Sequence, residues 1–80
     1  MTRAEILTVI REHLADELDV DPDTITETTL LRDDLGADSL ALYTLVQELE
    51  DRYGVRIGDE QAAAITTVGE AADFAEHALA

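Results

Sequence analysis

The sequence contains no cysteine, no lysine and no long apolar run. Without cysteine, neither a disulfide nor a thiolate metal site can form, and no side chain supplies a thiol. No stretch approaches the roughly 18 apolar residues of a membrane span, and the N-terminal residues MTRAEIL do not resemble a signal peptide. We therefore expect a cytoplasmic protein. The length of 80 residues predicts a single domain over residues 1–80.

Charge is strongly one-sided in this chain. Nineteen acidic residues stand against five arginines, which gives a net charge of −14. This surface would repel nucleic acid and anionic membranes, so both are excluded as partners, whereas basic protein surfaces would be attracted to it. Acidic chains can also be disordered, but 46% hydrophobic residues with clear periodicity indicate a folded domain.

A capping box marks the start of the first expected helix. The Thr2 hydroxyl would accept a backbone N–H, and the Glu5 carboxylate would reach back to the chain before the helix. Apolar residues then recur at helical spacing, which predicts a helix over residues 3–18. The proline of Asp21-Pro22-Asp23 cannot continue a helix interior and lies beyond its end. The residues of this apolar stripe are Ile6, Leu7, Ile10, Leu14 and Leu18.

The C-terminal third predicts two further helices. Asp59 can cap a short helix over about residues 60–65, and Thr67 with Glu70 forms a second capping box that opens a longer helix. No segment has a convincing strand pattern. The predicted fold class is therefore all-α, a small bundle of three longer helices and one short helix. In the last helix the inward side chains are expected to be Val68, Ala71, Ala72, Ala75 and Leu79, with Phe74 beside them.

A long connection over residues 19–37 separates the first two long helices. Loops above roughly 12–15 residues are uncommon unless they are functional or disordered. This connection contains regularly spaced apolar residues, so we expect a structured loop held against the core. Those residues are Val20, Ile25, Leu30, Leu31 and Leu35.

The helix expected over residues 39–53, which ends before Gly54, has two apolar stripes. The core stripe consists of Leu42, Leu45, Val46, Leu49 and Tyr53. The second stripe, Leu40, Tyr43 and Gln47, either covers the preceding loop or forms an exposed patch for a partner protein. Acidic residues would surround such a patch, namely Asp34, Asp38, Glu48, Glu50 and Asp51.

Neither a metal site nor an enzyme active site is predicted. The run that begins at Asp21 starts like a calcium loop, but it lacks the glycine at the sixth position and the glutamate at the twelfth. His13 and His77 have no partner at metal-ligand spacing; His13 is expected on the surface and His77 in the last turn of its helix. A catalytic Ser39 would need a base, an acid and an oxyanion hole, which nothing in the sequence provides.

The motif LGADSL places two helix-starting residues side by side. If Asp38 caps the helix, Ser39 becomes its first residue and its hydroxyl points outward beside the positive end of the helix dipole. Free N–H groups and the dipole both stabilise negative charge there. The alternatives from physics alone are a hydroxyl that carries a phosphoryl group and a serine that only caps the helix.

These residues resemble the acyl carrier protein family. Gly36-Ala37-Asp38-Ser39-Leu40 is similar to its phosphopantetheine attachment signature. The similarity extends in order over the approach loop (28–35), the second helix and its exit (45–57) and the closing helix (65–74). It implies the small acyl-carrier-type bundle with a long structured loop between helices one and two. Because the chain begins at a capped helix and ends just after the last one, it is expected to be a freestanding, type II-like carrier. We also expect it to be a monomer.

Family membership implies the chemistry and the partners. A phosphopantetheinyl transferase would attach 4′-phosphopantetheine to Ser39, and the thiol of this arm would hold acyl groups as thioesters. Acyltransferases, ketosynthases or other acyl-processing enzymes would then bind through basic surfaces. The implied partner-binding residues are Asp34, Asp38, Leu40, Tyr43, Gln47, Glu50 and Asp51. The positions expected to line a pocket for the acyl chain are Leu42, Leu49, Ile65 and Ala71.

The sequence departs from the family at two positions of the second helix. Fatty-acid carriers often have acids two and five residues after the serine, where this chain has Ala41 and Thr44. The departure favours a polyketide-like or other specialised pathway over fatty acid biosynthesis, and Asp38 argues against a carrier of peptide synthetases. Two alternatives from other classes remain: a helical protein-interaction module that is never modified, and an acidic metal-binding or regulatory domain.

Overall fold

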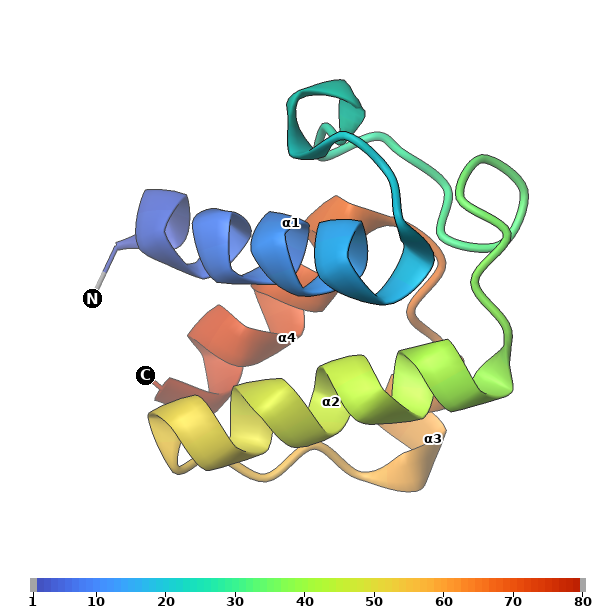
Figure 1. Ribbon diagram of the computed structural model, residues 1–80. Helices are drawn as coiled ribbons and strands as arrows, with labels where there is room; N and C mark the ends of the chain where they lie inside the picture. Colours follow the sequence, from blue (N-terminus) through green and yellow to red (C-terminus); the bar gives the residue numbers. More distant parts are fainter. Residues whose placement is uncertain (1, 80) are drawn as a thin grey trace.

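The computed structural model describes residues 2–79, which form a helical bundle (Figure 1). Its elements are α1 (Arg3–Leu18), a 3₁₀ turn η1 (Pro22–Thr24), α2 (Ser39–Tyr53), α3 (Asp59–Ala63) and α4 (Val68–Leu79). Within residues 2–79 there is no strand, only one isolated bridge between Leu30 and Thr67. The all-α fold class, with three longer helices and one short helix, is confirmed.

The helix starts follow the local capping chemistry with one exception. The Glu5 amide donates to the Thr2 hydroxyl at 3.2 Å, as the first capping box predicts. The third helix was predicted to be capped by Asp59, and this is wrong because the N-cap is Gly58 and Asp59 is already helical. The Gly58 amide donates to the Gln61 side chain at 3.0 Å, so a glutamine reaching back, rather than an aspartate, begins this helix.

The second capping box opens α4 as expected. The Glu70 amide donates to the Thr67 hydroxyl at 3.1 Å, and the Thr67 amide donates back to the Glu70 carboxylate at 3.0 Å. Hydrogen bonds from Thr66 and then Thr67 lower the pKa of Glu70 below its ordinary value, because they stabilise the charged form. This end of α4 is therefore fixed by charge-assisted hydrogen bonds.

The core lies where α1 packs against α2 and α4. The predicted stripes of α1, α2 and α4 supply most of it, and the loop adds the fully buried Ile25 and Leu31. Leu30 was expected to hold the loop to the core but is 37% exposed, because the chain turns there and Leu31 takes the inward position. The Leu79 side chain, also expected to point inward, lies outside the described side chains.

The connection between α1 and α2 is ordered by backbone pairing with the start of α4. The Gly69 amide donates to the Glu27 carbonyl at 2.8 Å, the Val68 amide to the Thr29 carbonyl at 3.1 Å, and the Leu31 amide to the Thr66 carbonyl at 3.0 Å. Gly69 suits this close pairing, since a Cβ on this residue would lie 3.0 Å from the Glu27 carbonyl oxygen and crowd it.

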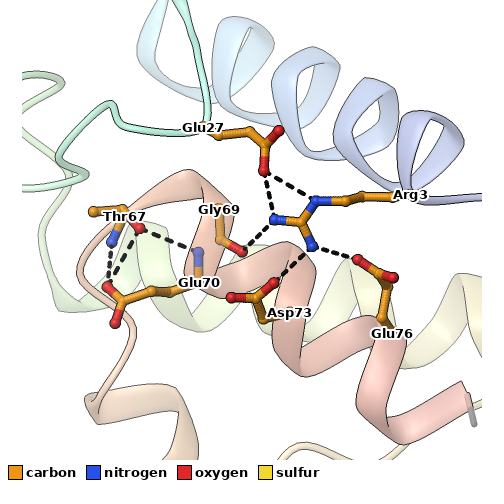
Figure 2. A network of polar contacts seen from close by, with 7 residues as sticks. All are labelled: Arg3, Glu27, Thr67, Gly69, Glu70, Asp73 and Glu76. Atoms are coloured by element: carbon orange, nitrogen blue, oxygen red, sulfur yellow. Dashed lines mark hydrogen bonds and ion pairs between the residues drawn. The ribbon is translucent and has the colours of Figure 1, made fainter.

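Arg3 joins three parts of the chain at one point (Figure 2). Its guanidinium donates to Glu27 in the loop, to Asp73 at 2.6 Å and to Glu76 in α4, and to the Gly69 carbonyl at 3.3 Å. The hydrogen bonds to Glu27, Glu76 and Asp73 raise the pKa of Arg3 above its ordinary value. One cation therefore offsets repulsion among three carboxylates that the fold brings together.

We predict that Arg3→Gln lowers Tm more than Arg56→Gln does. Both changes remove one positive charge, but Arg3 pairs with three carboxylates, whereas Arg56 is exposed and forms no ion pair within residues 2–79. Thermal unfolding followed by circular dichroism measures the difference. The gap should narrow in about 1 M salt, where screening acts within ~3 Å. Equal losses of Tm at low salt would contradict this role of Arg3.

The cap of α2 gives a second prediction. The Asp38 carboxylate accepts from the Ala41 amide at 2.9 Å. Asp38→Ala should cost about 1 kcal/mol, which lowers Tm by ~4–8 °C in a domain of this size. Asp38→Asn keeps an accepting oxygen and should lose much less. Asp51→Ala, which removes the same charge from an exposed position of α2, is the control for net charge; if it matches Asp38→Ala, the cap is not what stabilises the helix start.

Candidate functional site

Ser39 is the first residue of α2 and is exposed. Asp38 is extended (φ −94°, ψ −175°) and its carboxylate caps the helix, so Ser39 has no part in the cap. Within residues 2–79 no group forms a hydrogen bond with the Ser39 hydroxyl. It is also the only serine in the sequence. The arrangement leaves one unengaged hydroxyl beside the positive end of a helix of 15 residues.

A tight turn before Ser39 sets its position. The Gly36 amide donates to the Arg32 carbonyl at 2.9 Å, and the Ala37 amide donates to the Leu31 carbonyl at 2.8 Å. Gly36 has a φ of +70°, a left-handed conformation that favours glycine. No atom lies within 4 Å of the Cβ that another residue would have at this position, so the approach to Ser39 is open there. Ala37 is buried and anchors the turn to the core.

A groove of about 390 Å³ runs from Ser39 between α2 and α3. Leu42, Val46 and Ile57 give it an apolar floor, and Ala62 of α3 gives it a side wall of small side chains. Its polar lining consists of Arg32, Ser39, Gln47, Glu50 and Asp59. Such a groove can accept a partly apolar chain that begins at Ser39.

The residues predicted to contact partners lie along α2 and just before it. Leu40 and Tyr43 are 66% and 59% exposed, the largest exposed hydrophobic side chains on the helix, which places them on the surface rather than over the loop. Gln47 continues their stripe and is half-buried. The exposed patch is therefore a feature of the folded chain beside Ser39.

The acidic residues predicted to contact partners differ in the hydrogen bonds that they form within the fold. Asp34 accepts from the Leu30 amide at 2.8 Å and thereby closes the turn, while Asp38 caps α2. Glu50 accepts from the Ile57 amide at 2.9 Å and from Gln47 at 3.3 Å, which ties the segment after α2 back to the helix. Asp51 is exposed in the last turns, at the far end of α2 from Ser39.

The structure brings only one of the four expected acyl-pocket positions to the groove. Leu42 lines it, whereas Leu49 and Ala71 are fully buried in the core. Ile65 is also buried and borders a separate hollow beside Leu30. An acyl pocket lined by all four would need the helices to part.

Several groove residues were not anticipated from the sequence. Asp59 and Ala62 lie three residues apart on α3, but a helix of five residues is too short to show a periodic pattern. Arg32 could have been predicted from the sequence, because it is the single basic residue in the acidic segment that precedes Ser39. Val46 was assigned to the core, and its side chain also reaches the groove floor.

No second site emerges from the titratable side chains. Over residues 2–79 there is no group of three or more histidines, aspartates or glutamates arranged to hold a metal ion. His13 was expected on the surface; its side chain is partly buried, 17% exposed, and its Nε2 lies 3.4 Å from the Glu17 carboxylate. His77 is exposed in the last turn of α4, as expected. Each helix in the described part of the chain is too short or too polar to span a membrane.

Comparison with known proteins assigns the family. The family model described as the phosphopantetheine attachment site matches residues 8–75, a range that contains Ser39. An acyl carrier protein of Rubrobacter xylanophilus is 49% identical over the full length of both chains. The solved structure of an acyl carrier protein from Enterococcus faecalis superposes with a TM-score of 0.83 at 38% identity, covering 98% of this chain and 99% of that one.

A further structure agrees, that of a Mycobacterium tuberculosis protein named for the same family. It superposes with a TM-score of 0.82 at 35% identity and covers 90% of this chain and 96% of its own. Proteins of this family are carriers rather than enzymes, and the matched domain is the attachment site of 4′-phosphopantetheine. The chain belongs to the acyl carrier protein family.

Proposed function

We propose that Ser39 is the residue that holds the 4′-phosphopantetheine arm. The observation that supports this most strongly is its position: the only serine is exposed, free of hydrogen bonds within residues 2–79 and first in α2. The open approach at Gly36 and the groove that starts at Ser39 fit an extended group attached there. When bound, the arm supplies a thiol that holds acyl groups as thioesters.

Attachment needs little from this chain beyond a well-placed nucleophile. The Ser39 Oγ forms a new bond to the β-phosphorus of coenzyme A, the bond from this phosphorus to the bridging oxygen breaks, and 3′,5′-ADP leaves. The hydroxyl proton passes to the transferase, which brings Mg²⁺ with its substrate. Asp38 supports the step by holding the helix start while leaving the hydroxyl unengaged. Free amides of the first turn stabilise the added negative charge.

A carrier works with a phosphopantetheinyl transferase and with acyl-processing enzymes. We propose that they dock on Leu40 and Tyr43, which are exposed within about one turn of Ser39. Acids around this patch would steer basic surfaces of acyltransferases or ketosynthases into place, giving fast encounter without tight binding. The surrounding residues in this proposal are Asp34, Asp38, Gln47, Glu50 and Asp51.

The surface of α2 favours a dedicated polyketide-like or other specialised pathway over fatty acid biosynthesis. Ala41 is buried, and the Thr44 hydroxyl donates to the Glu17 carboxylate and to the Ala41 carbonyl, both at 2.9 Å. The negative charge in contact with Thr44 therefore comes from Glu17 of α1 rather than from an acid at position 41 or 44 of α2. Enzymes that read acids at positions 41 and 44 would find a different charge geometry.

The acyl chain would begin at the groove and pass Leu42. Leu49, Ile65 and Ala71 belong to the packed core, so a chain reaching them would have to separate α2 from its neighbours. Short acyl groups fit the groove without this movement. A monomer in the cytoplasm is the state in which we expect the carrier to work.

Attachment is tested by intact mass after incubation with coenzyme A, Mg²⁺ and a promiscuous phosphopantetheinyl transferase. The parent chain should gain the mass of one phosphopantetheine, and Ser39→Ala should gain nothing. Circular dichroism of both proteins verifies that they are folded. A folded parent that gains no mass would reduce Ser39 to a surface serine and leave the unmodified interaction module as the better description.

A further inference from the structure

Arg32 is a cation without a described partner beside the attachment residue. It is followed by Asp33 and Asp34, yet it forms no ion pair or side-chain hydrogen bond within residues 2–79. Arg3 and Arg52, by contrast, pair with carboxylates. Arg11 and Arg56 likewise form no ion pair within residues 2–79, but of the five arginines only Arg32 lines the groove at Ser39. Arg32 is therefore the cation available to an anion attached there.

The turn before α2 brings Arg32 back towards Ser39. The Leu31 carbonyl accepts from the Ala37 amide at 2.8 Å, and the Arg32 carbonyl accepts from the Gly36 amide at 2.9 Å. These bonds fold the chain so that residues separated by seven positions line the same groove, with Arg32 and Ser39 both at its surface. The backbone of Arg32 is thus held by hydrogen bonds of the turn, while its exposed side chain lines the groove.

The groove is surrounded by acidic side chains, so a cation in it would offset their repulsion of a bound anion. Glu50 and Asp59 also line the groove, and Asp34 and Asp38 are exposed in the segment that leads to Ser39. A phosphodiester on Ser39 would add another negative charge to a chain already at −14. Without a nearby cation this charge would be repelled from the groove. The planar guanidinium fork matches the two free oxygens of a phosphodiester.

The floor of the groove fits the segment of the arm that follows the phosphate. That segment has a carbon bearing two methyl groups, which needs an apolar surface, and then amides, which need polar partners. Leu42, Val46 and Ile57 form the apolar floor, and Gln47 lies among the polar lining residues. The groove therefore combines one cation, an apolar floor and polar side chains, the three kinds of surface that this segment requires.

We propose that Arg32 binds the phosphodiester on Ser39 and holds the first segment of the arm in the groove between α2 and α3. This role rests on the attachment at Ser39 proposed above. It makes Arg32 a positioning residue: it limits the directions in which the arm leaves the protein surface. A partner enzyme with a basic surface then competes with Arg32 for the phosphate when it draws the arm out.

The test compares the effect of modification in three proteins: the parent chain, Arg32→Gln and Arg56→Gln. Each is prepared in apo and holo form, and intact mass verifies loading. The measured quantity is the Tm of the holo form minus that of the apo form at low salt. Any general destabilisation by a substitution cancels in this difference. Arg56 is exposed and outside the groove, so Arg56→Gln is a control that matches the change in charge.

We expect the difference in Tm to be lower in Arg32→Gln than in the other two proteins by a few degrees, and this gap to shrink in high salt. The ³¹P resonance of the phosphodiester should shift in Arg32→Gln and not in Arg56→Gln. Arg32→Lys keeps the charge but not the guanidinium fork. Its difference in Tm between holo and apo forms should lie between those of the parent chain and Arg32→Gln.

Two results would overturn the proposal and have separate meanings. If all proteins load but Arg32→Gln and Arg56→Gln give the same Tm difference and the same ³¹P shift, Arg32 does not contact the phosphate and the attachment at Ser39 stands. If the folded parent gains no arm on Ser39, the proposed function falls and the role of Arg32 falls with it.

Discussion

The hydrogen bond from the Ala41 amide to the Asp38 carboxylate decides what Ser39 is able to do. A serine at the start of a helix ordinarily serves as its cap, and its hydroxyl is then occupied. Because Asp38 is the N-cap, Ser39 is the first residue of the helix and its hydroxyl forms no hydrogen bond within residues 2–79. The turn closed by Gly36 and Ala37 holds both residues in place. In the proposed function, attachment at Ser39 therefore depends on which of two adjacent residues caps α2.

The small number of positive charges also affects the rest of the fold. With five arginines against nineteen acids, each arginine has a large effect on its surroundings. Arg3 gathers three carboxylates and, with the backbone bonds of Glu27, Thr29 and Leu31, fixes the long loop to α4. The loop in turn positions the start of α2. Around Ser39 the exposed acids Asp34 and Asp38 outnumber the single cation Arg32, and in the proposed function they steer basic enzymes.

Local chemistry explains which features the sequence predicts. Helices α1 and α2 begin and end at the expected residues, since Thr2, Asp38 and Gly54 act within one turn. The predicted start of α3 was wrong because the Gln61 side chain accepts from the Gly58 amide. The sequence offered Asp59 as the more usual capping residue and did not indicate this contact. The exposure of Leu30 depends on how the loop pairs with the distant segment at Thr66, which places Leu31 inward instead. The groove was not predicted because its lining residues come from α2, α3 and the loop, which are brought together only in the folded chain. For Ser39, residue type and spacing left two alternatives, a hydroxyl that carries a phosphoryl group and a serine that only caps the helix. The resemblance to the acyl carrier protein family indicated attachment at Ser39, which stays a prediction.

The most direct test of this account is to locate the arm on the protein. The holo chain would be fragmented in the mass spectrometer and the modified residue read from the fragments. The account predicts that all phosphopantetheine lies on Ser39, because its hydroxyl is exposed and the Asp38 cap leaves it unengaged. A modification found on any of the threonines, such as Thr44, whose hydroxyl is hydrogen-bonded in the fold, would contradict it.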